Sequence, residues 1–195
     1  MDAYLFDLGN VLVGFDHRRF CRRFALAAGR LSEEEVYRSV VRGEINERFE
    51  LGEISGEHFC REVTEKWAPH ISMDRFRELW CDIFWENPGM KDLLTRLKGS
   101  ARLILVSNTN VWHMESILES IRFLESFDAR ILSFEVGARK PDTRIFEAAL
   151  AAAGAQPERC MYFDDLEENN TAARRLGIHA VLFRYQGTSS RGDEP

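Results

Sequence analysis

Short apolar runs and segments of helical period alternate along the second half of this 195-residue chain, and this alternation restricts the fold more than any other feature. A parallel strand that is buried on both faces gives a continuous apolar run, whereas a helix gives apolar residues at intervals of three and four. Strands that alternate with helices form a parallel sheet with helices on both faces. We therefore predict an α/β fold with a doubly wound parallel sheet. The predicted strands are the run from Ala3 that ends at Asp7, and residues 103–106, 129–132, 160–163 and 180–183.

Between the first two predicted strands lies a long stretch with a different pattern. From about Asp16 to Glu86 the apolar residues recur only at helical spacing, and no segment is typical of a strand. Gly29 is predicted to end the first helix of this stretch, and Ser32 with Glu35 to form a capping box for the second. We expect an all-helical insert whose aromatic residues form a small core of their own.

The end of the insert is marked by a change of composition. The last helical stripe extends to Phe84, Asn87 is predicted as an N-cap, and Pro88 as the first helical residue after it. The domain organisation predicted from these boundaries is a core of residues 1–15 and 87–185, a helical cap of residues 16–86, and a flexible tail of residues 186–195.

Composition limits the classes of function. The chain is 45% hydrophobic and 30% charged, which is typical of a globular protein, and its net charge of −6 argues against nucleic acid or an anionic membrane as partner. The four cysteines form no CxxC pair and are expected to be reduced, which favours the cytoplasm. No targeting segment or apolar run long enough to span a membrane is apparent. The oligomeric state is left open.

Polar side chains follow the ends of the predicted strands, and this placement suggests a site. The carboxyl ends of parallel strands meet at one edge of a sheet, where α/β proteins bind their ligands. Lys140 lies in a loop, before a proline that is predicted to start a helix. The candidate residues are Asp7, Ser107 and Asn108 with the following Thr109 and Asn110, Lys140, Asp164, Asp165 and Asn169.

The chemistry of these residue types favours a magnesium-dependent reaction of a phosphate ester. Clustered carboxylates repel one another unless a cation lies among them, and hard oxygen ligands suit Mg²⁺, which keeps room for a phosphate oxygen. Ser107, the lysine ammonium and turn amides near Leu8 and Gly9 could hold the other phosphate oxygens. Asp7 would then attack phosphorus, and water would hydrolyse the aspartyl-phosphate.

In these residues the sequence resembles the haloacid dehalogenase superfamily. The resemblance rests on Asp7, Ser107-Asn108, Lys140-Pro141, and Asp164-Asp165 with Asn169, in the order of the four motifs of that superfamily. It covers nearly the whole chain and implies a Rossmann-like core with a small α-helical cap inserted after the first strand. The amino-acid sequences of the motifs are similar to those of a subgroup of phosphatases. This subgroup includes a bacterial α-glucose-1-phosphate phosphatase and is related to the amino-terminal phosphatase domain of soluble epoxide hydrolase.

The resemblance implies a role for each matching residue. Asp7 is the nucleophile, and Ser107 and Lys140 are catalytic groups that hold phosphate. Asp164 acts on the metal directly or through water. The implied substrate-binding residues are Leu8, Gly9, Ser107, Asn108 and Lys140, and the implied metal ligands are Asp7, the Gly9 carbonyl, Asp164 and Asp165.

One position departs from the superfamily pattern. Most of its phosphatases have an aspartate two residues after the nucleophile as general acid and base, and here that residue is Gly9. General acid–base help is worth about 10²–10⁴ in rate. We expect either a good leaving group, such as that of a sugar 1-phosphate, or a neighbouring proton donor. The candidate donors are Asp16, His17 and His113.

The sequence therefore predicts a phosphomonoester hydrolase that uses Mg²⁺ and acts on a small phosphorylated metabolite such as glucose 1-phosphate. One alternative is a non-catalytic member that binds a phosphometabolite or a partner protein. A 2-haloacid dehalogenase is less favoured, because a site without a cation has no use for two further carboxylates. A hinge near Phe15 and Pro88 would let the cap open and close. The candidate cap contacts to substrate are His17, Arg18, Glu47 and Trp112.

Overall fold

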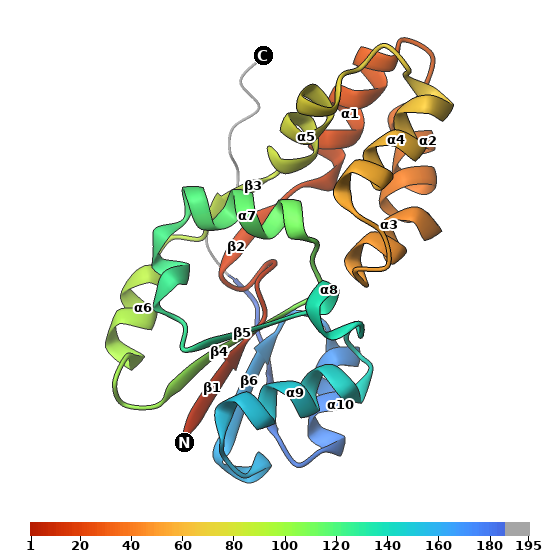
Figure 1. The fold of residues 1–195 in the computed structure, drawn as a ribbon. Helices are drawn as coiled ribbons and strands as arrows, with labels where there is room; N and C mark the ends of the chain where they lie inside the picture. Colours follow the sequence, from red (N-terminus) through yellow and green to blue (C-terminus); the bar gives the residue numbers. More distant parts are fainter. Residues whose placement is uncertain (186–195) are drawn as a thin grey trace.

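The computed structural model describes residues 1–185, and its centre is a five-stranded sheet in the order β5-β4-β1-β6-β7 (Figure 1). All neighbouring strands of this sheet run parallel. The first strand lies in the middle, with Phe6 beside Leu105 on one side and Phe163 on the other. The predicted doubly wound parallel α/β fold is confirmed. The strands are β1 (Ala3–Phe6), β4 (Arg102–Ser107), β5 (Ala129–Leu132), β6 (Cys160–Asp164) and β7 (His179–Leu182).

Helices cover both faces of this sheet, and alternate residues of each strand point to opposite faces. Phe6 and Leu105 belong to one apolar cluster, which includes Ile117 of the covering helices. Leu5 belongs to the other cluster, together with Phe146. The helices on the first face are α6 (Met90–Leu97), α7 (Val111–Ser120) and the short η2 (Arg122–Ser126), and those of the second cluster are α9 (Thr143–Ala153) and α10 (Glu167–Arg175). The remaining short helices are α8 (Ser133–Val136) and η3 (Pro157–Arg159).

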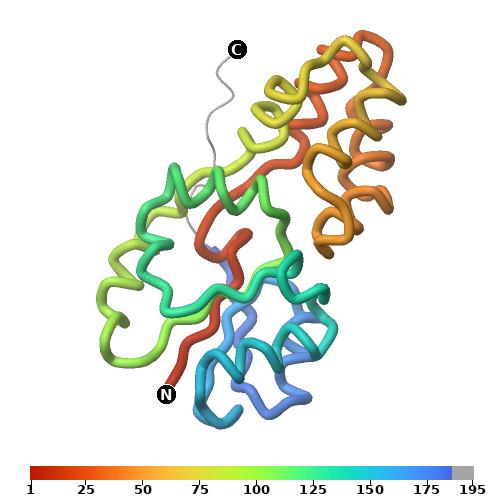
Figure 2. Tube along the Cα trace, in the orientation of Figure 1, coloured from red at the N-terminus to blue at the C-terminus, as the bar shows by residue number. Residues whose placement is uncertain are grey.

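A separate group of helices, here called the helical unit, lies apart from the sheet and its covering helices (Figure 2). The chain enters it after β1. Gly29 ends the first helix with a φ of 74°, and the capping box between Ser32 and Glu35 is present as predicted. The core of the unit is aromatic, with Phe20 packed edge-on against Trp80. Its elements are α1 (His17–Ala28), α2 (Glu33–Val36), the π-helical turn η1 (Tyr37–Val41), α3 (Glu44–Glu50), α4 (Gly56–Trp67) and α5 (Met73–Cys81).

The expectation that residues 16–86 contain no strand is wrong. Helix α5 ends at Cys81, and β3 (Phe84–Glu86) pairs with β2 (Val13–Phe15) in a two-stranded antiparallel sheet that carries the chain out to the helical unit and back. Each strand of this pair has only three residues, and its partner is far away in the sequence. Local periodicity therefore could not reveal it.

The N-cap predicted at Asn87 is also wrong. Helix α6 begins after Gly89, which has a φ of 86° and occupies the capping position. The Asn87 side chain instead donates to the carbonyl of Val11 at 3.1 Å, and its main-chain N–H donates to the carbonyl of Leu12. Asn87 thus ties the returning strand to the turn after β1.

Several contacts besides the β2–β3 pair join the helical unit to the rest of the molecule, and two of them involve glycines. Trp112, at the start of α7, is 4% exposed and lies in the aromatic core of the helical unit, where its indole fills the space beside Gly56. At the other end, Gly52 lies against the carbonyl of Phe134 in α8. The helical unit is therefore held by contacts other than the predicted hinge at Phe15 and Pro88.

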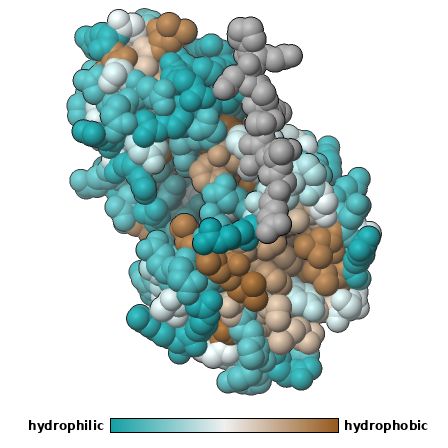
Figure 3. All heavy atoms as spheres, turned by 180° about the vertical axis from the view of Figure 1, so that it is seen from behind, coloured by the Kyte–Doolittle hydropathy of each residue, from teal (hydrophilic) through white to brown (hydrophobic). Residues whose placement is uncertain are grey.

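The cysteines are free in the structure, as the sequence predicts. All four cysteines are free, and three of them are buried. No helix among residues 1–185 is long and apolar enough to cross a membrane. On the face that Figure 3 shows, hydrophilic side chains cover most of the helical unit. The tail predicted at 186–195 lies outside the described residues.

Candidate active site

The carboxyl end of β1 brings Asp7 next to Lys140. The ammonium of Lys140 lies 2.5 Å from Oδ1 of Asp7 and 2.9 Å from Oδ2 of Asp164, so it bridges the ends of two adjacent strands. Oδ1 of Asp7 also accepts the main-chain N–H of Leu8 at 2.6 Å. Oδ2 of Asp7 receives no hydrogen bond from residues 1–185, so one oxygen of this buried carboxylate is free to react.

Asn108 fixes the loop that carries the lysine. Its Oδ1 accepts the Lys140 main-chain N–H at 2.7 Å, and its Nδ2 donates to the Lys140 carbonyl at 3.0 Å. The ammonium is further held by the carbonyl of Val106 at 3.1 Å. The prediction that Pro141 starts a helix is wrong, because α9 begins at Thr143. The Asn108 side chain is thus committed to the lysine loop.

Asp164 is completely engaged by hydrogen bonds. Its Oδ1 accepts the N–H of Leu166 at 2.8 Å, and both its oxygens lie within 3.1 Å of Nδ2 of Asn169. Its Oδ2 also accepts from Lys140 and from the hydroxyl of Tyr162. A carboxylate has about four acceptor sites, and these donors occupy them. Asp164 is therefore placed to position the lysine.

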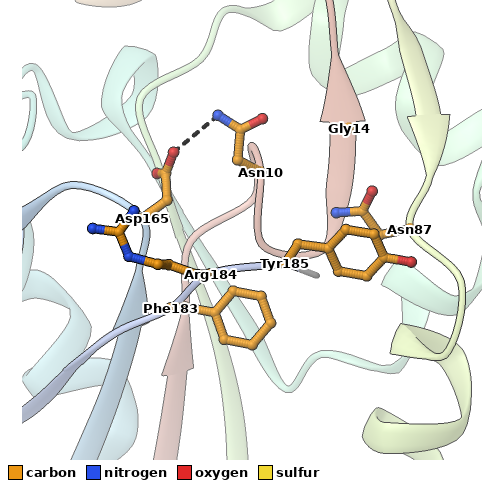
Figure 4. A pocket seen from close by; sticks show the side chains of 7 residues that line it. All are labelled: Asn10, Gly14, Asn87, Asp165, Phe183, Arg184 and Tyr185. Atoms are coloured by element: carbon orange, nitrogen blue, oxygen red, sulfur yellow. Dashed lines mark hydrogen bonds between the residues drawn. The ribbon is translucent and has the colours of Figure 1, made fainter. Parts of the chain in front are cut away.

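Asp165 is more accessible than Asp164. Nδ2 of Asn10 donates to its Oδ2 at 2.9 Å, and its other oxygen has no hydrogen bond within the described part of the chain. It lines the cavity of about 240 Å³ that also contains Asp7 and Lys140. Figure 4 shows a second cavity, of about 500 Å³, into whose wall the same Asn10–Asp165 pair is built. This pair separates the two cavities.

The three carboxylates fit a hard divalent cation. One oxygen from each of Asp7, Asp164 and Asp165 lies within 4.8 Å of the others, and a single ammonium stands against three acidic groups. Magnesium prefers oxygen ligands and usually takes one or two carboxylates. With Asp164 engaged, the carboxylates of Asp7 and Asp165 are the groups best placed for it.

Burial and charge act against each other at this site. Burial raises the pKa of Asp7 to about 7, although Lys140 acts in the opposite direction. Burial alone would lower the pKa of Lys140, but the Asp7 and Asp164 carboxylates outweigh it and raise that pKa. Burial likewise opposes the low pKa of Asp164, which Lys140 and the hydrogen bonds bring about. The lysine therefore stays charged beside the two acids.

Donors suitable for an anion surround the free side of Asp7. The main-chain N–H groups of Gly9 and Asn108 make no hydrogen bond to any of residues 1–185. The hydroxyl of Ser107 makes only a 3.4 Å contact with the carbonyl of Asn108. Together with the Lys140 ammonium, these groups could bind the oxygens of a phosphate.

Phe15 occupies the space beside Gly9. A Cβ at position 9 would lie 2.6 Å from the Phe15 ring, which is closer than real side chains approach. The aromatic ring thus fills the volume in which a side chain at this position would lie. Gly9 and Phe15 form a matched pair that the sequence pattern did not reveal.

Two of the three candidate proton donors are held elsewhere. Nδ1 of His113 pairs with the amide of Asn110 and its Nε2 lies 3.0 Å from the carbonyl of Trp80, so both ring nitrogens are used. Asp16 caps α1 and pairs with Arg22. His17 borders a cavity near the site. Burial lowers the pKa of His17 to about 4 and that of His113 to about 3, so both imidazoles are neutral.

The other residues predicted with His17 to contact substrate line neither of the cavities beside Asp7. Arg18 pairs with Glu34 on the surface, Glu47 is exposed and pairs with Arg139, and Trp112 is buried in the core of the helical unit. Sequence reasoning missed Glu50, which lies on α3 and does border such a cavity. A glutamate at a buried helical position gives no distinct signal in a single sequence.

The chain is similar to known hydrolases in both sequence and fold. The family model of haloacid dehalogenase-like hydrolases matches residues 1–177. A solved structure of a family enzyme from Bacteroides thetaiotaomicron, in complex with magnesium and inorganic phosphate, superposes with a TM-score of 0.85 at 27% identity and covers 97% of this chain and 98% of that one.

Curated relatives differ in length. A phosphorylated carbohydrates phosphatase from Thermotoga maritima is 26% identical over 93% of this chain and 84% of its own length. Acyl-CoA dehydrogenase family member 10 from Mus musculus is 33% identical over 69% of this chain. This chain spans only 13% of that mouse protein and 35% of a fungal drimenol cyclase that it also matches.

Proposed function

Because the chain belongs to the haloacid dehalogenase-like hydrolase family, we propose that it hydrolyses the phosphomonoester of a small metabolite with the help of Mg²⁺. The observation that carries the proposal is the arrangement of Lys140 between Asp7 and Asp164, with Asp165 beside them. Relatives that are phosphatases, and a neighbour that holds magnesium and phosphate, support it.

The proposed reaction has two steps. The free oxygen of Asp7 forms a bond to phosphorus while the bond from phosphorus to the leaving oxygen breaks, and the leaving group departs with the electron pair. A water molecule then attacks the phosphorus of the aspartyl-phosphate, the bond from phosphorus to the Asp7 oxygen breaks with its electron pair on the carboxylate, and the proton of the water leaves with inorganic phosphate. Lys140 balances negative charge throughout, and Asp164 and Asn108 hold it in position.

The phosphate would be bound by the main-chain N–H groups of Gly9 and Asn108, by the Ser107 hydroxyl and by Lys140, while the Leu8 N–H holds Oδ1 of Asp7. The metal would be held by Asp7, Asp165 and the Gly9 carbonyl, with Asp164 acting through its hydrogen bonds. When bound, Mg²⁺ supplies positive charge that stabilises the phosphoryl oxygens in the transition state.

The leaving group is proposed to be one that needs no protonation. The Phe15 ring fills the place beside Gly9, and His113 has both ring nitrogens engaged. Leaving oxygens of low basicity, as in an acyl phosphate or an anomeric sugar phosphate such as glucose 1-phosphate, would depart without an acid. Residues 16–86 would act as the cap that encloses this group.

The test is hydrolysis of acetyl phosphate, glucose 1-phosphate and ethyl phosphate with Mg²⁺. We expect the first two to be turned over and ethyl phosphate to be slower by about 10² or more, the value of missing acid catalysis. The Asp7→Asn variant, which keeps the size of the side chain, should release phosphate only at the background rate.

Other outcomes identify the alternatives. No release above that of the Asp7→Asn variant for any phosphate ester would favour a binding protein. Halide release from a 2-haloacid in the presence of a chelator would favour dehalogenation. Equal rates for ethyl phosphate and glucose 1-phosphate would contradict the proposed preference for reactive leaving groups.

A further inference from the structure

A cavity of about 60 Å³ lies between the end of the sheet and the helical unit, next to the larger cavity that contains Asp7. Its floor belongs to the proposed phosphate site, and its roof to the helical unit. The floor is formed by Leu8, Gly9, Ser107, Asn108 and Thr109, and the other lining residues are Phe15, His17, Glu50, Phe84 and His113. A group attached to a phosphate at Asp7 would extend into this space.

The carboxylate of Glu50, at the end of α3, brings an incompletely satisfied acceptor to this cavity. The residue is only 9% exposed, and its Oε1 accepts from Nδ2 of Asn46 at 3.1 Å. Its Oε2 is buried and makes no hydrogen bond, although Arg139 lies 2.9 Å away as an ion-pair partner with unsuitable orientation. The ion pair with Arg139 balances part of the charge, and the carboxylate keeps acceptor sites that a bound donor can use.

His17, at the start of α1, contributes a second polar group. Its ring packs against Phe15 and His113, and its nitrogens form no hydrogen bond to any residue that the structure describes. A neutral imidazole has one donor and one acceptor nitrogen. It can therefore bind a hydroxyl group in either direction.

The charges around Glu50 favour neutral donors over anions. Arg139 is shared between Glu50 and the exposed Glu47, at 2.9 and 3.3 Å, so one cation faces two carboxylates. Arg139 is not among the residues that line the cavity, whereas Glu50 is. An anionic group in this small space would meet a buried carboxylate, and like charges repel strongly where water is excluded.

We propose that Glu50 and His17 form a subsite that binds the hydroxyl groups of the leaving group and rejects leaving groups that carry a carboxylate. This inference rests on the proposed function, because it identifies the floor of the cavity as the phosphate site. The class of substrate is a phosphate ester of a compact, neutral, hydroxylated molecule. A larger sugar would place its remaining atoms in the adjoining cavity of about 240 Å³.

The test compares three small phosphate esters that differ at one end. Their dissociation constants are measured by calorimetry with Mg²⁺ and the full-length Asp7→Asn variant, which cannot form the phospho-enzyme. 2-Hydroxyethyl phosphate should bind about 10-fold or more tightly than ethyl phosphate, as expected for a hydrogen bond to a charged acceptor. Phosphoglycolate, with a carboxylate in place of the hydroxymethyl group, should bind more weakly than ethyl phosphate.

Two further substitutions separate recognition from the ion pair with Arg139. Adding Glu50→Gln should abolish most of the preference for the hydroxyl and improve the binding of phosphoglycolate. Glu47→Gln is the matched control, because Glu47 lies on the same helix and pairs with the same Arg139 but is exposed. It should leave the ratio of the three dissociation constants unchanged.

Several results would overturn the inference. One is equal binding of 2-hydroxyethyl phosphate and ethyl phosphate, and another is an equal shift of the ratios of the dissociation constants by Glu47→Gln and Glu50→Gln. A fourth ester, ethanolamine phosphate, serves as a control for charge, and its binding more tightly than 2-hydroxyethyl phosphate would indicate a site for cations. The proposed function is tested apart from this by hydrolysis of acetyl phosphate with the wild-type chain. Binding needs no turnover, so the two failures are distinguishable.

Discussion

The imidazole of His113 illustrates how a side chain near a site can be excluded from its chemistry by its own hydrogen bonds. Nδ1 accepts from Asn110 and Nε2 donates to the carbonyl of Trp80, while the ring stacks on Trp80. Burial is the main cause of its lowered pKa, and among residues 1–185 His17 is the one titratable neighbour that adds to it. The role of His113 is therefore to connect α7 with α5.

This arrangement predicts a dependence of stability on pH. The pKa of His113 falls from 6.5 to about 3 on folding, so below pH 6.5 the unfolded chain binds a proton that the folded chain does not. The stability is complete above pH 6.5 and is lost as the pH falls toward 3, by about 2 kcal/mol at pH 5 for this one group. Urea unfolding of the wild type and of His113→Gln between pH 5 and 8 measures it.

The variant should lose less stability on acidification. Between pH 5 and 6, the slope of its unfolding free energy against pH should correspond to about one bound proton fewer than in the wild type. The comparison removes the contribution of the carboxylates, which both chains share. Parallel curves for the two chains would contradict a neutral, buried His113.

At the scale of the elements, α4 and α7 are matched across the boundary between the helical unit and the sheet. Gly56 is the first residue of α4, and a Cβ there would overlap the indole of Trp112. The backbone of Gly56 is in no left-handed conformation, so the glycine is required by the close approach alone. The indole anchors α7 in the helical unit through this contact.

Gly56→Ala should therefore destabilise the protein by about 1–3 kcal/mol, as overpacking does, although alanine is the better helix former. In the background of Trp112→Leu the same substitution should cost at least about 1 kcal/mol less, because the indole is gone. Urea unfolding of the four chains of this cycle gives the coupling. An equal cost in both backgrounds would show that the two residues are independent.

At the scale of the whole molecule, the proposed cation site would couple the stability of the fold to the concentration of Mg²⁺. A ligand that binds only the folded state raises stability by about 2.7 kcal/mol at 100 times its dissociation constant. For a chain of this size each kcal/mol raises the melting temperature by about 2–4 °C. We expect Mg²⁺ to raise the melting temperature by several degrees relative to a chelator.

Asp165→Asn should remove most of this increase, since Asp165 offers a free oxygen to the cluster. Asp74→Asn, which removes an exposed carboxylate in α5, should retain it. Thermal scans of the three chains with Mg²⁺ and with chelator make the comparison. An undiminished shift in Asp165→Asn would locate the cation elsewhere.

The sequence by itself determined the sheet, most of its helices, and the residues at its carboxyl edge. Strand and helix periods are local, and Asp7, Ser107 and Asp164 stand directly at strand ends, so connectivity alone brings them together. The double acid and the lysine could be assigned to one site without knowing any contact between them.

Only the tertiary structure decided how the helical unit meets that edge. Four features depend on packing between segments that are distant in the sequence. They are the pairing of β2 with β3, the ring of Phe15 against Gly9, Trp112 in the core of the helical unit, and Glu50 beside the small cavity. Helical periodicity tells which residues are buried, but it does not tell against which partner. The proposed reaction therefore follows from the order of the motifs, whereas the proposed choice of leaving group rests on contacts that form only when the chain has folded.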